Sequence, residues 1–99
     1  MILEVAELRI REGEDEAFLA AVAKAAPLFQ NSKGCRSMHL RKVIETAGLY
    51  RLQVEWETLE DHTVGFRESE AFTGWRALVS PYFTEPPRVD HSENVLTCF

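Results

Sequence analysis

One short segment, residues 52–83, holds most of the side chains that could do chemistry. It contains two Trp, two Arg, three Phe, one Tyr and one His. Trp56 ends a predicted strand, His62 lies on the inner face of the next predicted helix, and Trp75 with Arg76 lies on the helix after that. Such side chains can converge between a sheet and its helices, and small-molecule sites are typically apolar clefts with a few aimed polar groups. The segment therefore predicts a pocket for a flat aromatic ligand.

Each polar or amphipathic residue of this segment also has a purely structural interpretation. Trp56 at a strand end is typical of a core residue, and His62 on an apolar helix face is typical of a buried histidine with its hydrogen bonds satisfied. Arg76 has the acidic residues Glu70 and Glu85 nearby in sequence as ion-pair partners. Sequence alone leaves both interpretations open.

Several common constellations are missing from the chain. The five glycines are isolated, so there is no phosphate-binding loop and no G-x-G-x-x-G fingerprint, and no nucleophile elbow is present. The three histidines, His39, His62 and His91, are dispersed and lack metal-ligand spacing. His39 and His91 fall on alternating strands, where we expect a structural or interface role. We therefore expect no metal and no Rossmann-type cofactor.

Length and composition predict one domain covering residues 1–99. The net charge of −5 argues against a nucleic-acid partner, because phosphate backbones attract clustered Lys and Arg. No apolar stretch approaches the roughly 18 residues of a membrane span, and the N-terminus does not resemble a signal peptide. Cys35 and Cys98 have no C-x-x-C spacing, which favours free thiols in the reducing cytoplasm.

Hydrophobic periodicity predicts four strands and two helical regions. The strands cover residues 2–10, 35–44, 49–57 and 88–96. An apolar stripe predicts a helix over 14–30 that Pro27 disturbs in its last turn. A broken helix follows the third strand; Thr58 and Ser69 are its predicted caps, and the face carrying Leu59, His62 and Phe66 points inward. This order is typical of an α+β, ferredoxin-like split βαβ fold with an antiparallel sheet.

The chain resembles the antibiotic biosynthesis monooxygenase (ABM) family over nearly its whole length. The resemblance rests on "VEWETLEDHTVGFRESEAFTGWRALVSPYF", the hairpin before it, and "VAELRIREGEDEAFLAAVAKAAPLF" near the start. It implies a homodimer in which two ferredoxin-like sheets close into an α+β barrel and each protomer keeps its own pocket. It also implies oxidation of an anthrone- or quinol-type aromatic by O2, with no cofactor.

The same resemblance implies roles for individual residues. Trp56 would hydrogen-bond or line the substrate, and Arg76 would stabilise an oxyanion or peroxide. His62 stands where the polyketide-oxidising branch has a tyrosine and would accept or donate a proton. Leu52 replaces an asparagine of that branch, which is a departure from its pattern. The expected substrate-binding wall consists of Leu52, Phe66, Phe72, Trp75 and Tyr82.

Two other functions stay open at this point. The same scaffold can serve as a non-catalytic module that binds or senses a small molecule, because fold does not dictate function. A second branch of the superfamily binds and degrades haem through a histidine on the last helix and an asparagine in the first strand. This chain has Trp75 and Leu8 at those positions, which makes haem the weakest of the three interpretations.

Overall fold

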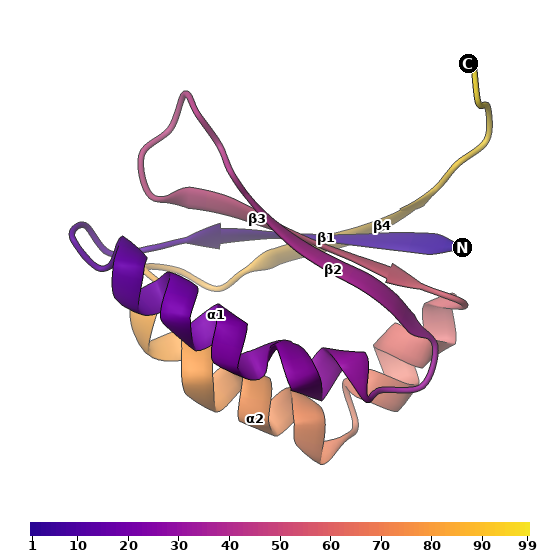
Figure 1. The fold of residues 1–99 in the computed structure, drawn as a ribbon, viewed down its shortest axis with the longest axis horizontal. Coiled ribbons are helices and arrows are strands. Elements are labelled where there is room, and N and C mark those ends of the chain that lie inside the picture. The colour runs from indigo at the N-terminus through magenta and orange to yellow at the C-terminus, as the bar shows by residue number, and fades with distance from the viewer.

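A four-stranded antiparallel sheet with both helices on one side forms the architecture (Figure 1). The computed structural model describes all 99 residues. In chain order the elements are β1 (Ile2–Arg9), α1 (Asp15–Gln30), β2 (Cys35–Lys42), β3 (Leu49–Trp56), the π-helix η1 (Asp61–Phe66), α2 (Glu70–Val79), the 3-10 helix η2 (Ser80–Tyr82) and β4 (Arg88–Glu93). The strand order β2-β3-β1-β4 confirms the predicted ferredoxin-like, α+β fold.

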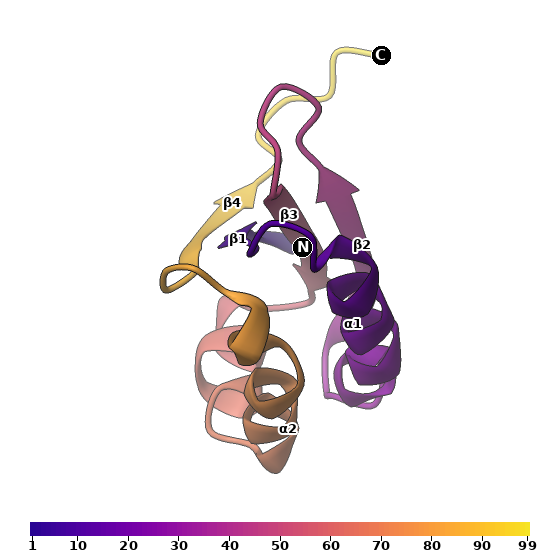
Figure 2. The ribbon, with the colours of Figure 1, turned by 90° about the vertical axis from the view of Figure 1, so that its left-hand side faces the viewer.

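Alternation along the two central strands decides which face of the sheet is buried. Tyr50, Leu52, Val54 and Trp56 of β3 all point toward the helices and are at most 3% exposed. On β1 the residues that share this face are Glu4, Ala6 and Leu8, each also buried. Because neighbouring side chains of a strand point to opposite faces, the intervening residues form the other, uncovered surface. The core therefore lies between one sheet face and the helix layer (Figure 2).

The first helix is fixed to the sheet by its predicted apolar stripe. Its buried residues are Phe18, Val22, Ala25 and Phe29. The Tyr50 hydroxyl on β3 donates a hydrogen bond to Asp15 Oδ2 at 2.5 Å, which ties the first turn of α1 to the sheet. Pro27 does not end the helix, which continues to Gln30, since the proline lacks only its own N–H and its carbonyl still accepts from Asn31 N at 3.0 Å.

The helical region after β3 differs from a regular helix. Thr58 Oγ1 accepts from Asp61 N at 3.1 Å, as predicted for a cap, but residues 61–66 then form a π-helix in which Arg67 N donates to His62 O at 3.1 Å. His62 and Phe66 face inward, whereas Leu59 is 39% exposed and the prediction for it was wrong. The wider π turn changes which residues share a face.

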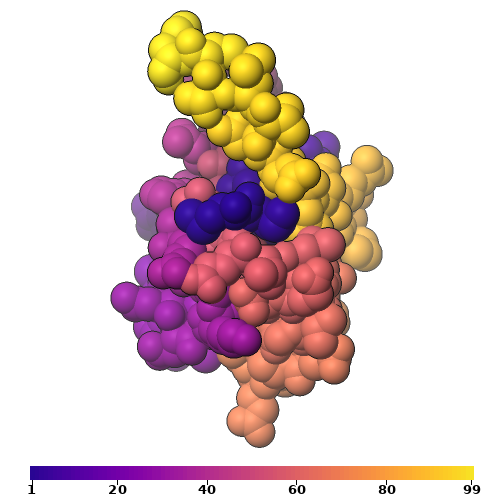
Figure 3. Space-filling view, turned by 90° about the vertical axis from the view of Figure 1, so that its right-hand side faces the viewer, coloured from indigo at the N-terminus to yellow at the C-terminus, as the bar shows by residue number.

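The second part of this region follows the prediction closely. Ser69 Oγ accepts a hydrogen bond from Phe72 N at 3.4 Å and so caps α2, whose buried residues are Trp75 and Val79. The strand predicted over 88–96 is shorter than expected, because β4 pairs only with β1 and the last pair is Ile2 with Glu93. Residues 94–99 then leave the sheet and project from the body (Figure 3).

The face of the sheet opposite the helices is not covered by any element of this chain (Figures 1 and 2). Leu3 and Val5 of β1 lie on it and are half-buried. No helix combines the length and the apolar character that crossing a membrane requires. Both cysteines are free, and the cytoplasmic location stays a prediction.

We expect Gly34→Ala to destabilise the protein more than Gly13→Ala. Both glycines have φ of +82°, so alanine at either position incurs the left-handed penalty of roughly 1–2 kcal/mol. A Cβ at Gly13 meets nothing within 4 Å, but at Gly34 it would lie 2.0 Å from Asp61 Oδ2, at the start of η1. Urea unfolding should show the larger loss for Gly34→Ala; equal losses would contradict the role of this contact in seating η1.

Candidate functional site

A cavity of about 550 Å³ lies between the sheet and α2. Its walls come from β1, β3, η1, α2, the connection after α2 and the start of β4. The lining residues are Glu4, Ala6, Leu8, Leu52, His62, Arg67, Phe72, Trp75, Arg76, Ser80, Phe83, Thr84, Glu85, Pro86, Pro87 and Val89. Its volume is in the range of pockets that hold a small organic ligand.

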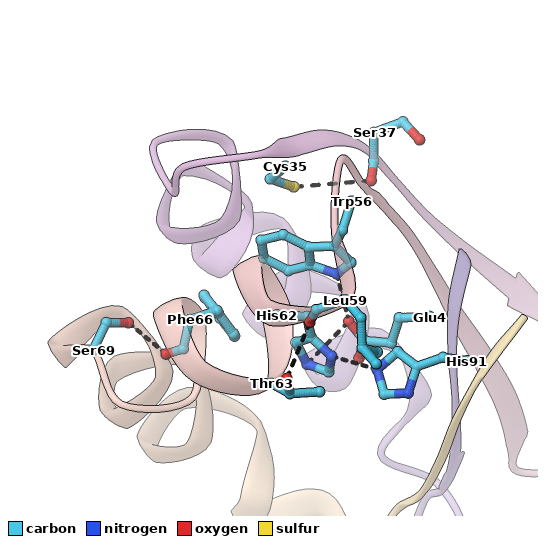
Figure 4. A network of polar contacts seen from close by, with 10 residues as sticks. All are labelled: Glu4, Cys35, Ser37, Trp56, Leu59, His62, Thr63, Phe66, Ser69 and His91. Carbon is cyan, nitrogen blue, oxygen red and sulfur yellow. Dashed lines mark hydrogen bonds and ion pairs between the residues drawn. The ribbon is translucent and has the colours of Figure 1, made fainter. Parts of the chain in front are cut away.

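The most unusual residue of the cavity is Glu4, a carboxylate on the core-facing side of β1 that is 4% exposed. Its Oε1 accepts a hydrogen bond from Trp56 Nε1 at 3.0 Å and lies 3.3 Å from His62 Nε2 (Figure 4). Trp56 reaches it because β1 and β3 pair Ile2 with Trp56, which makes the indole a diagonal neighbour of Glu4 on the same face. A buried carboxyl requires such partners.

His62 is held on three sides. Its ring stacks on the Trp56 indole with centroids 5.2 Å apart and planes 20° from parallel. Besides the contact of Nε2 with Glu4, its Nδ1 lies 2.7 Å from Nε2 of His91. His91 is directly opposite Glu4 in the pairing of β1 with β4, so its side chain extends to the same face. Glu4, His62 and His91 thus form a continuous chain of polar contacts from the cavity to the edge strand (Figure 4).

Burial sets the protonation of this chain. Burial raises the pKa of Glu4 from 4.5 to about 7, opposed by the Trp56 hydrogen bond and by the positive charge of Arg67. The pKa of His62 is lowered from 6.5 to about 4, chiefly by burial and to a smaller extent by the nearby Arg67 and His91. The pKa of His91 is also lowered, chiefly by burial. Both members of the Glu4–His62 pair are therefore driven toward their neutral forms, as expected when charge is removed from water.

Two arginines at the cavity have no carboxylate within 4.0 Å. Arg67 and Arg76 are both exposed, and the Arg76 guanidinium lies 6.0 Å from the centre of the Phe72 ring. The nearby acid Glu85 is paired with Arg9 at 2.9 Å instead. The ion pairs that the sequence offered for Arg76 are thus not formed. The site presents uncompensated positive charge to whatever enters it.

Five of the eight sequence-predicted site residues line this cavity, namely Leu52, His62, Phe72, Trp75 and Arg76. The other three do not. Trp56 is 0% exposed and its indole N–H donates to Glu4. Its position therefore supports the Glu4 carboxyl and does not provide a surface for the ligand. Phe66 is enclosed between Phe29 and Trp56, with ring centroids 4.5 and 5.4 Å away. Tyr82 packs against Phe18 at 6.2 Å.

The sequence did not predict that Glu4, Arg67 and residues 83–87, which connect the helical region to β4, line the cavity. A signal for Glu4 was present: it lies between Ile2 and Ala6 in the alternation of the first strand, at a position where an apolar residue is expected. His91 was expected to have a structural or interface role, and the structure places it in contact with His62, beside the site. Arg67 carries no such sequence signal.

Other parts of the surface offer less chemistry. A second hollow of about 340 Å³ lies between α1 and β2, lined by mostly apolar residues together with Gln30, Cys35, Arg36 and Ser37. It contains no buried ion pair. No group of three or more His, Cys, Asp or Glu side chains is arranged to hold a metal ion.

Comparison with known proteins is consistent across sequence and structure. The sequence model of the family "Antibiotic biosynthesis monooxygenase" matches residues 1–78. The uncharacterized protein YczJ of Bacillus subtilis (strain 168) is 43% identical over 95 residues, covering 96% of this chain and all of that protein. A crystal structure from Bordetella bronchiseptica, named provisionally as an antibiotic biosynthesis monooxygenase, is 43% identical with a TM-score of 0.93, covering 96% of this chain and 97% of that one. Rv0793 from Mycobacterium tuberculosis shares the fold, with a TM-score of 0.78 at 19% identity and coverage of 99% and 98%.

The buried pair predicts a characteristic pH dependence of stability. The raised pKa of Glu4 contributes stability that is complete below pH 4.5 and is lost as the pH rises to about 7. The lowered pKa of His62 contributes stability that is complete above pH 6.5 and is lost as the pH falls through about 4. The two effects oppose each other, so we expect the free energy of unfolding to change little between pH 4.5 and pH 6.5.

Substitution of Glu4 should expose the contribution of His62 to the pH dependence of the free energy of unfolding. In Glu4→Gln the lowered pKa values of His62 and His91 are no longer opposed by the raised pKa of Glu4, so the free energy of unfolding should rise by at least roughly 2–3 kcal/mol from pH 4 to pH 6.5. Urea titrations across this range measure it. Glu70→Gln, which removes an exposed carboxylate of α2, should keep the flat profile. A Glu4→Gln profile as flat as that of the wild type would contradict the buried pair.

Proposed function

Because the chain belongs to the antibiotic biosynthesis monooxygenase family, we propose that it binds a flat phenolic aromatic in the cavity and oxidises it with O2. The observation that carries this proposal is the meeting of two features at one cavity. A buried proton-accepting pair, Glu4 and His62, lies at its inner wall, and two unpaired guanidiniums, Arg67 and Arg76, lie where it opens to solvent. A site that removes a proton from a phenol and then holds the anion needs both.

The reaction begins with loss of the phenolic proton to the buried pair. The electron-rich anion is stabilised by the guanidinium of Arg76, whose planar array of donors suits an oxyanion. The anion itself supplies the electrons that reduce O2, and a carbon–oxygen bond forms to give a peroxide at the activated carbon. For an anthrone-type methylene, loss of water from this peroxide leaves a carbonyl, so CH2 and O2 become C=O and H2O. The proposal includes no cofactor.

The remaining wall residues shape the space for an aromatic ring. Leu52, Phe72 and Trp75 provide apolar surface, which excludes water and thereby strengthens the interaction between Arg76 and the anion. Leu52 offers no hydrogen bond where related enzymes that oxidise polyketides have an amide, so we propose a quinol or another phenol that needs no donor at that point. Trp56 does not line the cavity; its indole N–H donates to Glu4 and so positions the carboxyl.

We expect oxygen uptake with a panel of hydroquinones, naphthohydroquinones and anthrones, measured with chelator and without added flavin. Arg76→Gln should lower kcat/KM for the best substrate at least about tenfold, which corresponds to about 1.4 kcal/mol of transition-state stabilisation. Arg36→Gln is the matched control, because Arg36 is an exposed arginine on β2 outside this cavity. Protein-free controls correct for autoxidation of the quinols.

Uptake equal to the protein-free rate across the panel would contradict catalysis. Saturable binding of the same aromatics would then favour the non-catalytic binding module. A Soret band that titrates with added haem would instead favour the haem-binding alternative.

We also propose that the protein acts as a homodimer that uses the uncovered sheet face. The half-buried Leu3 and Val5 lie in the middle of that face, on a central strand. An apolar strip on an open sheet gains stability when a second copy covers it, and two-fold dimers are the commonest way to do so.

Val5→Glu should therefore shift the protein toward the monomer, because it buries a carboxylate in the proposed interface. Sedimentation velocity over a range of concentrations measures this shift. Leu19→Glu, which changes a residue of α1 that is 44% exposed on the helix side of the sheet, should leave the association unchanged. Equal effects of the two variants would contradict the proposed interface.

A further inference from the structure

The contacts of His62 leave it without a free acceptor for a substrate proton. Its Nε2 is 3.3 Å from Glu4 Oε1 and its Nδ1 is 2.7 Å from His91 Nε2. Both ring nitrogens are thus committed to protein partners, and the stacked Trp56 indole fixes the ring plane. To take a proton from a ligand, the imidazole would have to break one of these contacts. The neighbouring residue that could take the proton instead is Glu4.

Glu4 has the free atom that His62 lacks. Its Oε1 receives the contacts from Trp56 and His62, while Oε2 has no hydrogen-bond partner in the protein. The one fully enclosed side-chain N or O atom without a partner is Oε2 of Glu14, so Oε2 of Glu4 is not sealed in the core. Glu4 is one of the residues that line the cavity, and we take the cavity as the space that this oxygen faces.

We propose that Glu4 is the catalytic base of this site: its Oε2 takes the phenolic proton of the bound aromatic, while His62 and His91 hold the carboxyl in place. In this step the substrate O–H bond breaks, a new O–H bond to Oε2 forms, and the electron pair stays on the substrate oxygen as a phenolate. No electron is transferred. The inference rests on the function proposed above, in that it names the proton acceptor for the same phenolic substrate.

The surroundings of Glu4 suit a base that works near neutral pH. The ionisable groups around it come from each element packed on it: His62 from η1, Arg67 from the turn after η1, His91 from β4 and Cys35 from β2. Of these Arg67 favours the carboxylate, and burial favours the acid that forms after proton transfer. A base is most effective when its pKa lies near the working pH.

His62 and His91 are positioning residues in this scheme. A neutral imidazole that donates from Nε2 to Oε1 of Glu4 and accepts at Nδ1 from His91 can keep both contacts whether the carboxyl is charged or neutral, because the proton adds to Oε2 and Oε1 remains an acceptor. The half-buried His91 links this arrangement to the edge strand. Loss of either ring should therefore displace the carboxyl without removing the titrating group.

The test uses a nitrophenol whose own pKa lies near neutrality, a probe that needs no O2. If Glu4 holds the proton that the bound phenol gives up, Glu4 and the probe together carry one proton in the complex. The affinity of the wild type should then pass through a maximum near pH 7 and fall on both sides by up to about tenfold per pH unit. Absorbance of the bound nitrophenolate and calorimetry measure the profile.

Glu4→Gln keeps the shape and an oxygen acceptor for Trp56 but cannot hold the proton. Its affinity for the probe should rise with pH to a plateau, because the phenolate binds beside the arginines and no second proton is involved. Glu4→Asp keeps a titrating carboxyl and should retain the affinity maximum at reduced affinity. This variant distinguishes loss of the proton acceptor from a general disturbance of the fold at this position. Glu70→Gln, an exposed carboxylate outside the cavity, should match the wild type.

A maximum that persists in Glu4→Gln would overturn the proposal and return the role of base to His62. Because the probe is not oxidised, the profile reads the proton acceptor even if no quinol supports oxygen uptake. Failure of the proposed oxidation and failure of the proposed base are therefore seen in different experiments.

Discussion

A carboxylate buried on the covered face of the sheet constrains everything around it. At the position of Glu4 the alternation of β1 points the side chain into the core, where an unpartnered carboxyl would be strongly destabilising. The fold supplies partners from three other elements: Trp56 from β3, His62 from η1 and, through His62, His91 from β4. The register of the sheet and the seating of η1 are thereby linked to one another through a single side chain.

The concentration of aromatic residues in the second half of the chain is explained largely by support of this group. Phe29, Trp56 and Phe66 pack in a cluster behind the cavity, and Trp75 joins this cluster to the cavity wall by packing edge to face on Phe29 at 4.9 Å. Rigid rings pack without losing much conformational freedom and fix the plane on which His62 stacks. The ligand itself would meet only a few aromatic side chains, chiefly Phe72 and Trp75.

The arrangement separates two electrostatic tasks in space. In the proposed function, proton acceptance is assigned to the inner wall, where burial brings the pKa of Glu4 to about 7. In the same proposal, stabilisation of the resulting anion is assigned to Arg67 and Arg76, which are exposed. If an acid of the chain paired with Arg76, its charge would be neutralised; Glu85 is instead held by Arg9, which leaves the guanidinium available.

The sequence by itself determined the fold, the family and much of the cavity wall. Strict alternation in residues 49–57 and the apolar stripe in 14–30 specify a sheet covered on one face, and Ser69 specifies the start of α2. These features are local, so periodicity and capping residues are enough to predict them.

Only the tertiary structure decided which groups meet at the cavity. The partners of Glu4 come from positions 52 to 87 residues away in the chain, and their meeting depends on strand register and on a π turn that no local pattern specified. Arg9 and Glu85 are likewise far apart in the sequence, and their pairing leaves Arg76 without this carboxylate. The pKa shifts follow from burial, and burial is a property of the assembled core, which is why the sequence alone does not reveal the carboxylate of Glu4 beside His62.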